Sequence, residues 1–283
     1  MLFSMSGFLL ASELSLTAPS LDKVGFGSWL TNSVFVAVLM VIIVVAFARS
    51  ATRHMAMVPM GSQNLFEALV EQLYDLIETI VGKRMTPRCF SLLATIFIFI
   101  LASNWFGLLP GVGTIGWGTE TSAGFHVETP LLRPCTADVN MTLAMALFFM
   151  VMWMFWTWQE VGLWGFLKHT FGPQGGAKGF ALVFMAVIFF LVGIIEMISI
   201  SFRPVSLSLR LFGNTLAGET LLDTMIGLGQ LLHMPEWMSG IVAVTVPLPF
   251  YFFELLVGLI QASVFMLLCA AYLRLSTSHG DEE

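Results

Sequence analysis

Long apolar stretches alternate along the chain with short polar or glycine-rich connections. They cover residues 29–48, 90–109, 139–158, 180–232 and 240–273. Each of the first three has about 20 residues, the length at which one helix crosses ~30 Å of hydrocarbon. The pattern therefore predicts helices that cross a membrane. It contains no internal repeat and no linker to a second domain.

The fourth and fifth stretches are too long for upright helices. At 1.5 Å per residue they would measure about 80 Å and 50 Å, so both helices must tilt strongly. The alternative divides the fourth stretch at Arg203-Pro204 and gives six crossings, but residues 199–206 have only modest turn chemistry. We therefore predict an all-α integral membrane protein with about five membrane-crossing helices. The last two are long, strongly tilted and form an antiparallel hairpin.

Residues 62–81, between the first two spans, follow a different pattern. Apolar side chains recur there at helical spacing: Leu65, Phe66, Leu69, Val70, Leu73, Leu76, Ile77 and Ile80. Acidic side chains lie between them, which predicts an amphipathic helix that packs on protein or lies in the membrane interface. Ser62 is a candidate N-cap of this helix, and Gly82 a candidate end.

The composition agrees with a membrane environment. Of 283 residues, 57% are hydrophobic and only 11% are charged, whereas soluble domains carry about 25% charged residues. There are too few polar side chains to cover a soluble surface, so lipid must cover much of it. The twelve lysines and arginines are scattered singly, which argues against nucleic acid as a partner. The three cysteines show neither CxxC nor metal-ligand spacing, and we expect no metal or cofactor.

Lysine and arginine positions predict the orientation. With five crossings, eight of these residues share one side: Arg49, Arg53, Lys83, Arg84, Arg88, Lys168, Lys178 and Arg274. Only Lys23 and Arg133 lie on the other side. The positive-inside rule then places the C-terminus in the cytoplasm or its equivalent. We interpret 1–283 as a single membrane domain, with an extracytoplasmic segment (1–28) and a helical part (29–283). Residues 1–11 lack a basic start and give only weak support for a cleaved signal peptide.

Two local patterns have simple interpretations. Aromatic side chains gather at the end of the third span, at Trp153, Phe155, Trp156, Trp158 and Trp164. They indicate an interfacial belt in preference to a ligand site. Residues 172–179 contain glycines and a lysine without Walker spacing, which predicts a turn before the fourth helix and not a phosphate-binding loop.

Arg210 lies far from either end of the fourth stretch. A charge at such depth costs at least about 3 kcal/mol, so it usually faces protein or water and has a function. A guanidinium also stays protonated under all biological conditions. A structural ion pair is the alternative for Arg210. Arg203 lies nearer the basic side, where a side chain that snorkels to the interface explains it equally well.

Helical geometry distributes the polar neighbours of Arg210. Asn214, four residues later, lies on the same face, whereas Glu219, nine residues later, lies on the opposite face. Glu196 and Arg203 precede Arg210 at steps of seven and share its stripe. One helix therefore carries a fixed cation on one side and a titratable carboxylate on the other.

The fifth stretch carries Glu254 and Gln261 on one stripe, seven residues apart. In an antiparallel hairpin, pairing Arg210 with Gln261 would bring Glu219 near Glu254. Two carboxylates close together in a membrane suit groups that pass protons on, while capped or interface-exposed glutamates are the alternative. Gly258 beside this stripe either permits close helix approach or faces lipid.

Four segments together resemble subunit a of F-type ATP synthases. They are PVSLSLRLFGN at 204–214 with AGE at 217–219, PCTADVNMTLAMAL at 134–147, FGLLPG at 106–111 and QASVFMLLCAAY at 261–272. The resemblance covers most of the chain from Trp29 onward, and the arginine segment is its most specific part. The N-terminal segment is not recognisable.

The resemblance implies a proton-conducting stator subunit in the membrane sector, without catalysis or a cofactor of its own. Its partners would be the ring of subunit c, the peripheral-stalk subunit b, the rest of the ATP synthase and membrane lipid. It would lie in a bacterial-type plasma membrane or, alternatively, an organellar inner membrane. Sodium as the ion stays open, because most selectivity would reside in subunit c.

The resemblance also assigns roles. Arg210 would face the ring, and the outlet would lie toward Glu196. The residues that line the inlet half-channel or support the arginine would be Asn214, Glu219, Glu254 and Gln261. Some family members carry histidine at the position of Glu254, so the relay here has two carboxylates and no evident imidazole.

Two other protein classes fit less well. A proton-coupled secondary transporter usually shows inverted repeats and helices broken in both halves, which the sequence lacks. A receptor or scaffold would not need Arg210, Glu219 and Glu254 at matching depth.

Overall fold

The computed structural model describes residues 31–53, 55–56, 60–109, 111–112, 116–121, 124–171 and 180–277. Within these residues, the helices long and apolar enough to cross a membrane are Asn32–Thr52, Thr86–Gly107, Val139–Gly162, Val187–Ile226 and Glu236–Ser276. This confirms the predicted all-α membrane fold with five crossings. The predicted extracytoplasmic segment (1–28) and the predicted turn at 172–179 lie outside the described residues.

The first part of the chain forms α1 (Asn32–Thr52), α2 (Ser62–Val81) and α3 (Thr86–Gly107). Helix α2 is the predicted amphipathic helix and has the predicted bounds. Gly82 ends it with φ 90°, and its N–H donates to the Glu78 carbonyl. The predicted cap at Ser62 is wrong, because Gly61 holds the N-cap position and Ser62 is already helical.

The second part consists of α4 (Val139–Phe171), α5 (Phe180–Ile226), α6 (Leu228–Leu231), α7 (Glu236–Thr245) and α8 (Pro247–Thr277). Helix α5 continues through Pro204, which removes only one backbone donor, so the six-crossing alternative is wrong. Helix α4 bends at Gly162, whose φ is 73°. The last apolar stretch is divided into α7 and α8 just before Pro247, which cannot donate a helical hydrogen bond.

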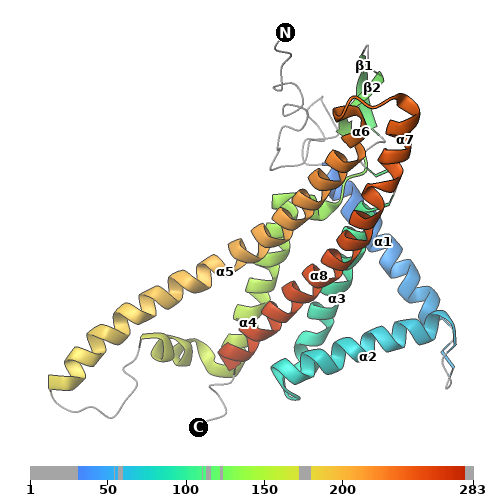
Figure 1. The fold of residues 1–283 in the computed structure, drawn as a ribbon. Helices are drawn as coiled ribbons and strands as arrows, with labels where there is room; N and C mark the ends of the chain where they lie inside the picture. Colours follow the sequence, from blue (N-terminus) through green and yellow to red (C-terminus); the bar gives the residue numbers. More distant parts are fainter. Residues whose placement is uncertain are drawn as a thin grey trace.

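Helices α5 and α8 slant across the whole molecule (Figure 1). They approach each other near α6 and α7, which connect them, and separate toward their other ends. At the same end as α6 and α7, an antiparallel hairpin of β1 (Gly116–Thr121) and β2 (Gly124–Pro130) projects from the helices. This hairpin was not predicted, because its short strands lie between spans without an apolar pattern. A 3-10 turn, η1 (Cys135–Ala137), follows and leads into α4.

The interior is apolar and draws on α2, α3, α4, α5 and α8. The aromatic tail of α4 contributes to it, with Trp153 only 2% exposed and Trp156 only 6%. Phe155 and Trp158 on the other side of the helix are 49% and 48% exposed. The predicted aromatic belt is therefore wrong for Trp153 and Trp156, because the helix turns them toward the core.

Candidate functional site

Arg210 lies on an exposed face of α5, within the part of the helix long enough to cross a membrane. Among the described residues it has no hydrogen-bond or ion-pair partner. The structural ion pair that the sequence left open is therefore not formed within this part of the chain. An unpaired cation in apolar surroundings calls for water or a second protein at this face.

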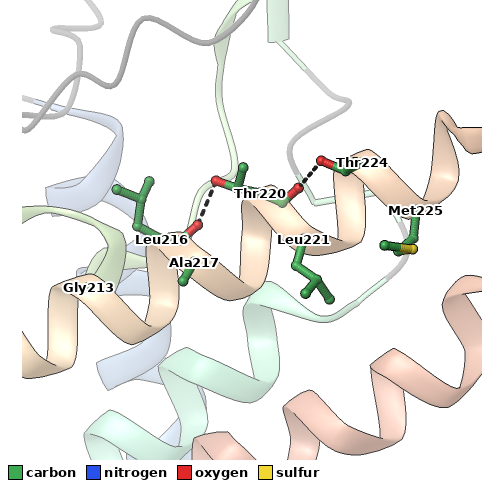
Figure 2. A pocket seen from close by; sticks show the side chains of 7 residues that line it. All are labelled: Gly213, Leu216, Ala217, Thr220, Leu221, Thr224 and Met225. Atoms are coloured by element: carbon green, nitrogen blue, oxygen red, sulfur yellow. Dashed lines mark hydrogen bonds between the residues drawn. The ribbon is translucent and has the colours of Figure 1, made fainter. Parts of the chain in front are cut away.

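Small side chains continue the face of Arg210 along α5. They contribute to an open pocket lined by Gly213, Leu216, Ala217, Thr220, Leu221, Thr224 and Met225 (Figure 2). The Thr220 hydroxyl donates to the Leu216 carbonyl at 2.8 Å, and the Thr224 hydroxyl to the Thr220 carbonyl at 2.7 Å. These hydroxyls are satisfied by their own helix, so another helix can approach the pocket without losing hydrogen bonds.

Asn214 joins α5 to α8. Its Nδ2 donates to Oε1 of Gln261 at 2.7 Å, and Gln261 is only 5% exposed. The sequence predicted that Arg210 would lie level with Gln261. In the structure Gln261 instead contacts Asn214, one helical turn further along α5. The prediction assumed parallel axes, whereas α5 and α8 converge toward α6 and α7 (Figure 1).

Glu254 of α8 lies against the backbone of Gly218 on α5. A methyl group added at Gly218 would overlap the Glu254 carboxylate, so glycine makes the close approach possible. The structure therefore brings Glu254 beside the residue that precedes Glu219, near the predicted level. The Glu219 carboxylate itself forms an ion pair with a different residue.

That partner is Arg133, from the segment between β2 and η1. Its Nη2 lies 3.5 Å from Oε2 of Glu219, and the two side chains are 18% and 27% exposed. Asp223, one turn beyond Glu219, is close enough to Arg133 for electrostatic attraction. An extramembrane segment thus reaches the carboxylates of α5 at the end where α6, α7 and the β-hairpin lie.

The sequence did not assign Arg133 or Asp223 to the site. A signal for Asp223 was present, since it follows Glu219 at i+4 on one helical face. For Arg133 the only signal was its place as one of two basic residues on the outer side. Its contact with Glu219 joins positions 86 residues apart, which periodicity cannot reveal.

On the other side of Arg210, Glu196 and Arg203 lie along α5 toward its N-terminus. Both are half-buried. The guanidinium of Arg203 lies 4.6 Å from the ring centroid of Tyr272 on α8 and 5.8 Å from that of Trp153 on α4. It is therefore directed at neighbouring helices. These contacts do not test whether the side chain reaches the membrane interface.

Contacts from α3 and α4 hold the two long helices in place. The Trp105 indole donates to the Leu255 carbonyl at 3.1 Å, next to Glu254. Behind Arg210, the hydroxyls of Thr142 and Ser208 form a buried hydrogen bond of 3.0 Å between α4 and α5. A Cβ at Gly258 would lie 3.2 Å from Asn104, so this glycine permits close approach to α3 and does not face lipid.

The family model and the similar proteins that match this chain all carry the name of one family. The ATP synthase A chain family matches residues 33–274. ATP synthase subunit a of Mycobacterium ulcerans is 34% identical over 246 residues, which cover 85% of this chain and 83% of that protein. ATP synthase subunit a of Citrifermentans bemidjiense is 31% identical over 264 residues, covering 92% and 93%. ATP synthase subunit a 1 of Pelobacter propionicus is 31% identical over 236 residues, covering 83% of each chain.

Proposed function

The chain belongs to the ATP synthase A chain family, and from that premise we propose that Arg210 faces a rotating ring of subunit c. Family membership makes the chain a multi-pass subunit of the proton-translocating membrane sector of ATP synthase. The proposal that Arg210 faces the ring rests on one observation. Arg210 is exposed midway along an apolar helix, without a partner among the described residues, beside a face of small side chains.

We propose that the inlet half-channel reaches this face past Glu254 and Glu219. Both lie on the side of Arg210 that is nearer α6 and α7, where Arg133 contacts Glu219. The outlet lies toward Glu196, on the opposite side of Arg210 along α5. Asn214 and Gln261 support the arginine by holding α5 and α8 together one turn away.

In this mechanism a proton enters past Glu254 and Glu219 and neutralises a carboxylate on a c subunit. The ring turns, and the carboxylate later releases its proton toward Glu196. Arg210 attracts the ionised carboxylate as it passes, since a nearby cation favours the charged form. Its permanent charge also stops a proton from moving directly between the half-channels. The flow is driven by about 2.3 kcal/mol per charge per 100 mV.

The subunit supplies a path and a field and performs no covalent chemistry. Its direct partners in this proposal are the c-ring and the peripheral-stalk subunit b, and its location is a bacterial-type plasma membrane. Purification in mild detergent tests the partners. A ring of small two-helix subunits should accompany the chain, whereas a solitary chain would contradict the proposal.

Substitution of Arg210 tests the mechanism. Arg210→Lys should assemble but fail to couple, because an ammonium in apolar surroundings can lose its proton whereas a guanidinium cannot. Arg210→Ala should let protons pass between the half-channels. The measurements are passive proton permeability of vesicles stripped of the catalytic head, and ATP synthesis in intact vesicles. Near-normal synthesis by Arg210→Lys would show that any positive charge suffices and would refute the argument from permanent protonation.

A further inference from the structure

Arg203 of α5 occupies an aromatic cage made by one ring from α4 and one ring from α8. Its guanidinium carbon lies 4.6 Å from the Tyr272 ring centroid and 5.8 Å from the Trp153 ring centroid. Trp153 is fixed in turn, because its indole N–H donates to the Tyr272 carbonyl at 3.0 Å and its side chain is only 2% exposed. Both rings lie within the ~6 Å at which the π face attracts a cation. The place of Arg203 is thus set by α4 and α8 as well as by its own helix.

An aromatic cage holds a cation without cancelling its charge. A carboxylate partner would neutralise most of the field of the guanidinium, whereas a π face carries no net charge. No carboxylate of the described residues lies within ion-pair distance of Arg203. On α4, Glu160 is held by Arg84 at 2.8 Å and also by Arg88.

The other charged groups around Arg203 do not cancel the positive charge of its guanidinium either. On α8, Arg274 is a second cation and donates to the Ile80 carbonyl at 2.8 Å. Tyr272 contacts the guanidinium through its aromatic ring, which carries no net charge. On α5, Glu196 and Arg210 stand seven residues to either side, about 10 Å along the helix axis. Arg203 therefore presents an uncompensated positive charge between them.

We propose that Arg203 is a second fixed cation of the translocation path, which favours proton release on the outlet side. The inference rests on the proposed function, in which a c-subunit carboxylic acid passes Arg210 and transfers its proton to the outlet. Arg203 shares the stripe of Arg210 and lies between it and Glu196. Its field stabilises the carboxylate left after the proton has gone, and it equally opposes uptake of a proton from the outlet. Arg203 thus promotes synthesis more than it promotes ATP-driven pumping.

The test compares the two directions in the whole complex reconstituted in vesicles. Arg203→Gln should slow ATP synthesis by up to about tenfold at neutral pH on the side of the catalytic head, and slow ATP-driven pumping less. Raising the head-side pH by about one unit, at constant total driving force, should restore synthesis. A unit charge about 10 Å from a carboxyl group lowers the pKa of that group by about one unit at an effective dielectric constant of about 20. A purely structural role would slow both directions alike, without rescue by pH.

Matched variants complete the test. Arg203→Lys should keep the wild-type pH profile, because the two aromatic faces at this position, which Arg210 lacks among the described residues, favour the charged ammonium. Tyr272→Phe retains the ring and should do the same, whereas Tyr272→Leu should reproduce part of the effect of Arg203→Gln. If Arg203→Gln fails to assemble, Arg203→Met supplies a second uncharged chain. Equal losses in both directions, or an unchanged pH profile in the uncharged variants, would overturn the inference. Failure of the unsubstituted complex to pump would instead refute the proposed function.

Discussion

Gly218 is the residue on which the position of the Glu254 carboxylate depends. A Cβ at this site would overlap that carboxylate, which is the end of a flexible side chain and would swing away. We expect Gly218→Ala to assemble normally but to slow ATP-driven proton pumping by roughly tenfold, because one step of the proposed relay would be displaced. Gly240→Ala is the control, since a Cβ there meets nothing within 4 Å. Normal pumping by Gly218→Ala would show that translocation does not need Glu254 at this place.

A related prediction concerns Glu219 and Glu254, the two glutamates of the proposed proton path. Glu219→Gln and Glu254→Gln keep the shape of each side chain but remove its titratable proton. Each should slow pumping by about 10- to 100-fold while the complex still assembles. The measurement is ATP-driven quenching of a pH-sensitive dye in vesicles, with assembly checked by the head activity that the membranes retain. Undiminished pumping in both single variants and in the double variant would assign these residues to structure alone.

The sequence was sufficient to predict those site residues whose unusual chemistry can be recognised within a single helix. Arg210 and Asn214 follow from charge at depth and from helical spacing. The partner of Glu219 did not follow, because Arg133 reaches it from a connection between spans. The cage around Arg203 was missed for a related reason. Trp153 and Tyr272 looked like ordinary aromatic residues until three helices brought them together.

The contact between Asn214 and Gln261 sets the register of the last two crossings. Cysteines that replace these two residues should be joined readily by a short bifunctional maleimide in membranes, because the native side chains are 2.7 Å apart. Cysteine at Thr224, about 15 Å further along α5, should not be joined to position 261. Crosslinking measured on gels would contradict the register if Arg210→Cys reacted with position 261 better than Asn214→Cys did.

Apolar length and periodicity predicted the existence and type of the long elements. Helix α2 has the bounds that its amphipathic pattern indicated. The missed details depend on the backbone at single residues. Pro204 remains within α5, whereas Pro247 begins a new helix. Gly162 bends α4 through its positive φ. A proline or glycine permits each of these outcomes, and packing against neighbouring helices decides between them.

The whole molecule should have one orientation, which the basic residues predict. Single cysteines at the exposed positions Lys83 and Leu275 should react with a membrane-impermeant maleimide only from the cytoplasmic side, and a cysteine at His233 only from the other side. The native cysteines should contribute little background in the folded protein. Burial, for example, raises the pKa of the Cys135 thiol to about 11, and the thiolate is the reactive form. External labelling at position 275 would contradict the five-crossing orientation.

The inward-turned hydroxyls of Thr220 and Thr224 have a consequence for a partner that moves. Each hydrogen bond between sliding surfaces would have to break at every step, at a net cost of about 0.5–1.5 kcal/mol. A face whose hydroxyls already donate to their own helix offers only van der Waals contact, which changes little as one apolar side chain replaces the next. Such a face has low friction. The main energy barrier to rotation past this face would then come from the charge of Arg210 and not from hydrogen bonds between the two surfaces.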